Sequence, residues 1–263
     1  MRMRIGTMTA TAVLGLLALT GAAGAHTPYL KPNLFTTPQR DHVSVEAAFT
    51  EDFFIPDVVM KADDYHVVTP SGAKLKTGPV TYLRDLAVFE VDLPETGTYR
   101  ISTGQRLGST RKMALVAGKW QPFREGEVPA GARIAEAQSI TRADVYVSKG
   151  PASDKALAPT GTGLEIVPLV HPNRIDPGTA LPVRLLFQGK PLAGAVISLH
   201  GEGLADEEDA KAARVTTDAD GRASVTLPRA GTFLLLSRHR IEAADGPVAV
   251  QSHSVTLTFQ VEG

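Results

Sequence analysis

The stretch Leu93-Pro94-Glu95-Thr96-Gly97-Thr98-Tyr99 decides the fold, because it turns the chain from one alternating strand into the next. Residues 86–93 before it and residues 98–103 after it both show the period-two pattern of strands, with Pro and Gly between them. The same spacing recurs at Leu227-Pro228-Arg229-Ala230-Gly231-Thr232-Phe233. Many β-sandwich domains enter a late strand through such a phrase, so its repetition predicts two related sandwiches in tandem.

Short strand patterns extend from this stretch towards the N-terminus. Residues 42–49 place four apolar side chains on one face, namely Val43, Val45, Ala47 and Phe49. Residues 65–68 and 141–148 also have strand character. Between them, residues 118–137 contain the only tryptophan, Trp120, and show no clean period. We expect this segment to be an irregular excursion with a short helical turn.

A run of Gly, Pro, Ala, Ser and Thr residues after residue 149 marks a domain boundary. Strand patterns then resume up to the C-terminus, interrupted by an acidic insert at residues 201–211. The sequence therefore predicts an all-β chain of two tandem immunoglobulin-like or transthyretin-like β-sandwich domains. The expected limits are 26–150 for the N-terminal domain, 151–162 for the linker and 163–263 for the C-terminal domain.

The first 25 residues have the pattern of a cleaved signal peptide. Arg2 and Arg4 form a positive start, residues 10–23 are apolar or small, and Ala23-x-Ala25 is a cleavage motif. No other stretch reaches the roughly 18 apolar residues of a membrane span. We therefore expect an exported, soluble protein, periplasmic or secreted, whose mature chain begins at His26.

Composition narrows the range of functions. The chain has no cysteine, so an exported form takes its stability from its core and not from disulfides. Without the leader it has 25 Lys and Arg against 28 Asp and Glu, a balance that argues against nucleic acid or an anionic membrane surface as partner. It lacks a Gly-x-Ser-x-Gly elbow, a cysteine nucleophile, a His-Glu-x-x-His motif and a Gly-rich phosphate loop. We therefore expect that the protein is not an enzyme.

His26 is the most definite candidate for a metal ligand. If the signal peptidase cuts after Ala25, the same residue carries a free α-amino group and an imidazole. A further imidazole from elsewhere in the chain would complete a set of three nitrogen ligands, which suits copper(II) or nickel(II). The predicted cofactor is therefore a nickel or copper ion.

Three other histidines are candidates for the further imidazole, in the order His239, His253 and His200. His239 and His253 belong to the two strands of one hairpin, and strand parity puts both on a predominantly apolar face. His200 ends a strand beside the acidic insert. The run Asp206-Glu207-Glu208-Asp209 in that insert lacks the alternating ligands and central glycine of an EF-hand loop, so we interpret it as a solvated loop.

Several phrases occur together in an order that resembles a known family. They are the Ala25-His26 junction, residues 163–168, residues 189–195, Thr217-Asp218-x-x-Gly221 and the strand from Gly231 to His239. Together they are similar to the domain-of-unknown-function family linked with the periplasmic component of nickel uptake. Thr27-Pro28-Tyr29 stands where that family usually has an acidic residue and a bulky aromatic residue. The resemblance implies tandem β-sandwiches, a periplasmic location and a membrane metal transporter as partner.

The sequence thus favours an exported protein that binds a divalent transition metal through His26 and supports metal uptake or handling. Two alternatives stay open. In the first, the protein is a structural or interaction module, and His26 binds no metal. In the second, the N-terminal chelate makes the protein a copper-dependent oxidase. The flat aromatic surface that such oxidases use on polysaccharides is not evident in a chain with one Trp and five Tyr.

Overall fold

The structure is a computed structural model that describes residues 26–123, 126, 128, 130–201, 204, 213–242 and 248–263. In these residues every regular element is a β-strand except one 3₁₀ turn, η1 (Lys155–Leu157), which confirms the all-β prediction. The predicted signal peptide and most of the acidic insert lie outside the described residues. Among the described residues, no helix has the length and hydropathy needed to span a bilayer.

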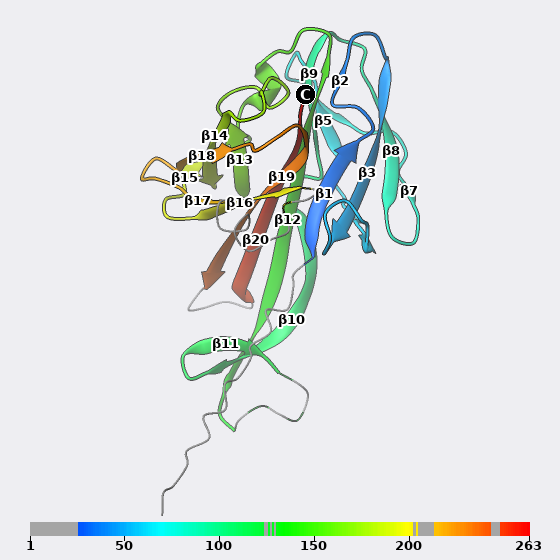
Figure 1. Ribbon diagram of the computed structural model, residues 1–263. Helices are drawn as coiled ribbons and strands as arrows, with labels where there is room; N and C mark the ends of the chain where they lie inside the picture. The colour runs from blue at the N-terminus through cyan, green and yellow to red at the C-terminus, as the bar shows by residue number, and fades with distance from the viewer. Residues whose placement is uncertain are drawn as a thin grey trace, which may run out of the picture.

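The strands form three sheets (Figure 1). The first sheet has the order β1 (Thr27–Pro32), β3 (His42–Thr50), β8 (Ala87–Asp92), β7 (Thr81–Tyr82), and β4 (Val58–Val59) pairs with β3. The third sheet has the order β13 (Leu164–Pro168), β14 (Ala180–Phe187), β15 (Lys190–Pro191), and β18 (Arg222–Thr226) also pairs with β14.

The second, central sheet is the longest and runs through the whole molecule. Its order is β17 (Arg214–Thr216), β16 (Val196–Gly201), β19 (Gly231–Glu242), β20 (Val248–Val261), β12 (Arg133–Lys149), β9 (Gly97–Ser102), β5 (His66–Val68), β6 (Lys74–Lys76). Three further strands belong to this sheet. β2 (Thr36–Thr37) and β10 (Arg106–Val116) pair with β12, and β11 (Lys119–Pro122) pairs with β10.

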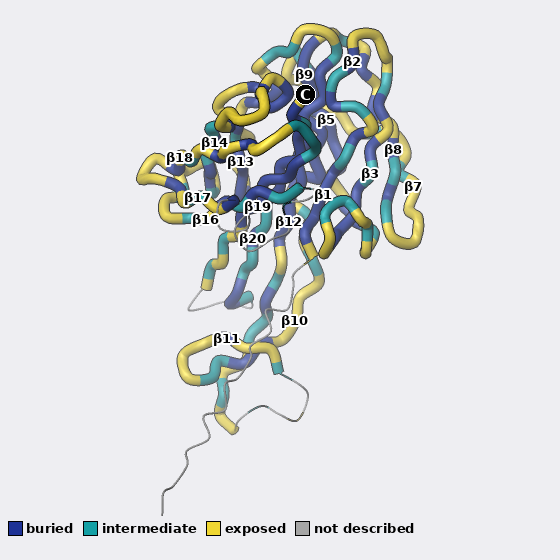
Figure 2. Tube along the Cα trace, in the orientation of Figure 1, coloured by how far each residue is buried: buried dark blue, intermediate teal, exposed yellow. Residues whose placement is uncertain are grey.

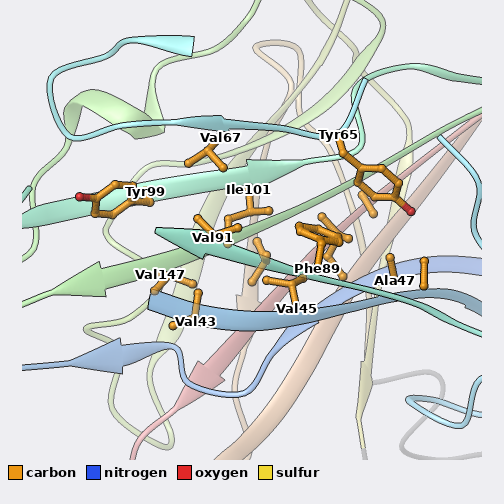
Figure 3. Close-up of a cluster of buried hydrophobic side chains, with 14 of the residues drawn as sticks. Val43, Val45, Ala47, Tyr65, Val67, Phe89, Val91, Tyr99, Ile101 and Val147 are labelled. Atoms are coloured by element: carbon orange, nitrogen blue, oxygen red, sulfur yellow. The ribbon is translucent and has the colours of Figure 1, made fainter. Parts of the chain in front are cut away.

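The first sheet packs on one end of the central sheet and forms the N-terminal core. The apolar face of β3 predicted from the sequence is buried here, together with inward side chains of β8, β5, β9 and β12 (Figure 3). The large aromatic side chains of this core include Phe89, Tyr65 and Tyr99, which are at most 6% exposed. This alternation of buried and outward residues is what two stacked sheets require.

The third sheet packs on the other end of the central sheet and forms the C-terminal core. This core contains Leu181, Val183 and Leu185 of β14 together with apolar side chains from one face of β19 and β20, namely Phe233, Leu235, Val255, Leu257, Phe259 and Val261. Phe233 and Phe259 lie directly opposite each other across β19 and β20, with ring centroids 6.1 Å apart. The buried parts of the chain thus form two sandwich cores, which lie at the two ends of the central sheet in Figure 2.

The two sandwiches share one sheet because β12 and β20 pair in parallel. The pairing runs from Glu136 opposite Val248 to Val145 opposite Thr258. The sequence predicts two sandwiches one after the other but does not predict that their strands pair. This pairing removes two sheet edges, whose unpaired backbone groups would otherwise face solvent. The domain limits 26–150 and 163–263 stay predictions, and the continuous sheet crosses the region between them.

The segment around Trp120 differs from the expected irregular excursion. β10 and β11 form a hairpin, and β10 continues along β12, so most of residues 118–137 that the structure describes is strand. This hairpin extends away from both sandwiches (Figures 1 and 2). Trp120 packs there with Met113, Ala137 and Val250 in a small separate cluster. The strand period is hidden in the sequence because β10 buries only two neighbouring residues, Met113 and Ala114, which do not alternate.

The two repeated phrases adopt the same backbone feature at their glycines. Gly97 has a φ of 130° and Gly231 a φ of 145°, values that residues with a Cβ rarely adopt. At Gly97 a Cβ would also lie 2.7 Å from the Pro70 ring. The Tyr99 hydroxyl donates to the Glu95 carbonyl and accepts from the Glu95 N–H, both at 2.6 Å. This contact closes the turn, as a tyrosine corner does in immunoglobulin-type sandwiches.

We expect Tyr99→Phe to lower the free energy of unfolding by about 1–2 kcal/mol, because the Glu95 backbone loses its partner while the ring still fills the core. Denaturant unfolding followed by circular dichroism measures the change. Tyr82→Phe is the control, since Tyr82 is 45% exposed, and it should change stability by less than about 0.5 kcal/mol. Equal effects of the two substitutions would contradict a structural role for the Tyr99 hydroxyl.

Candidate functional site

His239 and His253 lie directly opposite each other in the antiparallel β19–β20 pair. The hairpin placement and the shared face predicted from sequence parity therefore bring the two residues together. Both imidazoles contact the Phe187 ring of β14, at centroid distances of 4.9 and 5.0 Å. The pair thus lies at the margin of the C-terminal core, where the third sheet covers the central sheet.

The buried member of the pair is His253, which is 3% exposed. Its Nδ1 is buried and has no hydrogen-bond partner in the described residues, and its Nε2 lies 3.4 Å from the Gln251 Oε1. Burial, followed by the proximity of His239, lowers the pKa of His253 below its usual value. A neutral imidazole is the form that binds metals, so this environment favours the ligand state.

His26 lies on the other side of the central sheet. Its imidazole is half-exposed, with Nε2 3.5 Å from the Glu51 Oε1. It lines a cavity of about 380 Å³ together with Arg240, Ser252 and Ser254, which point away from the face that carries His239 and His253. The structure therefore does not bring His26 to either of its two preferred partners.

The cavity beside His26 is lined by several arginines. Arg106, Arg111 and Arg240 line the same cavity, and no Asp or Glu is among its lining residues in the described part of the chain. Arg240 is paired with the Glu242 carboxylate at 2.8 Å, and the carboxylate nearest to His26 is that of Glu51. Within the described residues, a chelate formed by the α-amino group and imidazole of His26 would have the Glu51 carboxylate beside it but no second imidazole.

His200, the third candidate partner, has a packing role. It is the penultimate residue of β16, stacks on Phe53 at a centroid distance of 4.3 Å, and its Nε2 lies 2.7 Å from the Ser198 Oγ. Burial, then the charges of Arg238 and Arg214, lower the pKa of His200 to about 4. The His200 side chain lies on one face of the central sheet, and the side chains of His239 and His253 lie on the other.

The described residues contain no group of three or more His, Cys, Asp and Glu side chains placed to hold a metal ion. Of the four predicted ligands, the structure therefore assembles two, His239 and His253. Sequence analysis missed Gln251, although its odd number places it on the same strand face as His253. It also missed Phe187, which only the packing of two sheets brings to the imidazoles.

These features define a class of protein: an all-β chain with two sandwich cores on one shared sheet and a pair of imidazoles at the margin of the second core. The chain belongs to the family described as Domain of unknown function (DUF4198), which matches residues 23–241. This confirms the resemblance to a domain-of-unknown-function family, whose description assigns no activity. No curated protein matches the chain.

Solved structures of bacterial adhesins show a distant likeness. The D0-D1 domain of intimin is 12% identical, over 88% of this chain and 96% of that chain, with a TM-score of 0.22. The Yersinia pseudotuberculosis adhesin InvE is 14% identical, over 88% of this chain and 58% of that chain, also with a TM-score of 0.22. Similarity at this level identifies no shared function.

Proposed function

We propose that this protein is exported and binds a divalent transition metal, nickel or copper, through His239 and His253. The observation that carries the proposal is the direct cross-strand pairing of two imidazoles, one of which has a buried ring nitrogen without a partner. Side chains directly opposite in an antiparallel pair have Cβ atoms about 5 Å apart, a separation at which two imidazoles can share one ion. Imidazole is a suitable ligand for both metals.

The proposed donor set is small and leaves positions open. His239 and His253 supply nitrogens, and the Gln251 carboxamide oxygen is close to the His253 ring. The remaining coordination positions would be taken by water or by a ligand that arrives with the metal. Structural metal sites are usually closed by four protein ligands, so an open site suits a protein that takes up and releases a metal. The role we propose is metal handling in uptake, with a membrane transporter as partner, and not catalysis.

The test is a calorimetric titration of Ni²⁺ and Cu²⁺ into signal-cleaved wild-type protein and two variants, His239→Ala and His253→Ala. Each variant should bind the preferred metal at least about tenfold more weakly, because one of two protein nitrogens is lost. His42→Ala is the matched control, since His42 is a strand residue near the surface that contacts Asp41, and it should bind like wild type.

A further arm separates the histidine pair from the predicted N-terminal chelate. Wild-type protein is compared with a form that has one extra residue before His26, which blocks chelation by the α-amino group. If binding is lost only in this form and kept in both alanine variants, the metal is held by His26 and the proposed pair is wrong. If no titration shows saturable binding, the protein is not a metal-binding protein of this kind.

A further inference from the structure

A second cavity, of about 550 Å³, lies on the face of the central sheet that points away from the N-terminal core. Its floor is the outer face of β5, β9 and β12, with His66, Arg100 and Arg142 among the lining residues. Its other wall is residues 150–162, here called the covering segment, which follows β12 and contacts β9 through η1. The cavity is thus built from the junction between the two sandwiches, a common place for ligand sites.

Arg100 is buried on this floor and forms no ion pair with any described residue. It is 5% exposed, and its Nη1 donates to the Ala158 carbonyl of the covering segment at 2.8 Å, while its Nε has no hydrogen-bond partner among the residues that the structure describes. In the described residues, no carboxylate oxygen lies within 4.0 Å of its guanidinium nitrogens. A buried charge of this kind is costly unless something of opposite charge compensates it.

None of the described neighbours of Arg100 forms a direct ion pair with it. Tyr146 lies opposite Arg100 across β9 and β12, but burial raises the pKa of its hydroxyl to about 12, so it is neutral. The two nearby carboxylates, Asp144 and Glu165, both contact the Arg142 guanidinium, at 2.8 and 3.4 Å, so their excess negative charge acts on Arg100 only from a distance.

The rim adds further positive charge. Lys74 and Lys155 both line the cavity. Lys74 is paired with the Asp64 carboxylate at 2.9 Å, whereas Lys155, packed over Gly72, has no ion pair in the described residues. The cavity therefore has two cations, Arg100 and Lys155, that lack carboxylate partners within the described part of the protein.

We propose that this cavity binds a small organic molecule through a carboxylate or phosphate group that contacts Arg100. The planar guanidinium matches the geometry of both oxyanions, and Lys155 at the rim provides a second, more flexible cation. The hydroxyls of Thr160 and Thr162 also line the cavity and can bond polar atoms of the rest of the ligand. The site is separate from the His239–His253 pair and does not depend on the metal.

The experiment titrates inorganic phosphate and succinate into the full chain in the presence of a chelator, with succinamide as the uncharged comparison. Saturable binding of at least one anion and none of succinamide is expected. Arg100→Met should weaken anion binding at least about tenfold, because it removes a charged hydrogen-bond donor from a desolvated site. Lys155→Gln, at an exposed position, should weaken it about threefold.

Lys76→Gln is the matched control, because Lys76 is an exposed lysine on the same β5–β6 hairpin as Lys74 but does not line the cavity. This variant and His253→Ala should bind the anion as wild type does. If circular dichroism shows that Arg100→Met does not fold, the effect of Lys155→Gln on anion binding tests the proposal instead. Absence of saturable anion binding, or equal binding by wild type and Lys155→Gln, would overturn the proposal. Which anion binds more tightly distinguishes a carboxylate ligand from a phosphate ligand.

Discussion

Arg142→Met should lower the free energy of unfolding by about 3–5 kcal/mol, because it leaves two buried carboxylates without their cation. Arg142 is 4% exposed, and its Nε lies 2.8 Å from the Asp144 Oδ2. Its Nη1 lies 3.4 Å from the Glu165 Oε2. Glu165 in turn accepts hydrogen bonds from the backbone N–H groups of Thr160 and Thr162, so the same charge network holds the covering segment.

Arg240→Met is the matched control for this substitution. Arg240 also pairs with a carboxylate, that of Glu242 at 2.8 Å, but both side chains are about half exposed. Loss of an exposed pair changes stability by less than about 1 kcal/mol. Adding Asp144→Asn to Arg142→Met should recover part of the loss, because one unpaired charge is removed. Similar losses for Arg142→Met and Arg240→Met in urea unfolding would show that burial does not set the energy of this network.

Phe259→Ala should be comparably destabilising, by about 3–5 kcal/mol, because it removes a large side chain from a closed core. Phe259 is fully buried and stacks with Phe233 across β19 and β20. The space it leaves is bounded by the third sheet, which is tied to the same strands and can collapse only in part. Chemical denaturation followed by circular dichroism measures the loss of stability.

Two further variants define the cause of that loss. Phe259→Leu retains most of the buried volume and should cost less than half as much as the alanine substitution. Leu107→Ala removes an apolar side chain that is 63% exposed, so its effect should stay within about 0.5 kcal/mol. A loss for Phe259→Leu equal to that for Phe259→Ala would indicate that ring stacking, and not filled volume, is the stabilising term.

Much of the strand content could be predicted because each strand that faces a core carries its own alternation. Residues 42–49 show this pattern clearly, and β3 buries the predicted face. The β10–β11 hairpin could not be predicted in this way, because β10 buries only Met113 and Ala114 and β11 only Trp120, too few residues to show an apolar period. The parallel pairing of β12 with β20 joins segments more than 100 residues apart, and no local pattern specifies such a partner.

At the candidate metal site, too, local relations between residues could be predicted and long-range ones could not. Strand parity within one hairpin was enough to place His239 and His253 on a common face, because their relation is local. The relation of His26 to that pair depends on which face of the central sheet the first sheet covers. Tyr29 and Ala48 pack against Leu234 and Leu236 there, on the side away from the pair. This packing is a tertiary contact that the order of residues does not show.

By itself, the sequence determined that the chain is built of strands and that two histidines share one strand face, since both follow from alternation along a short segment. Only the tertiary structure decided that the two sandwiches share a sheet and that Arg100 is a buried cation. In the sequence, Arg100 alternates with the core residues Tyr99 and Ile101, as a solvent-facing residue would. It becomes buried because the covering segment lies over the outer face of β9. The burial of a side chain depends on what packs against it as well as on the direction in which it points.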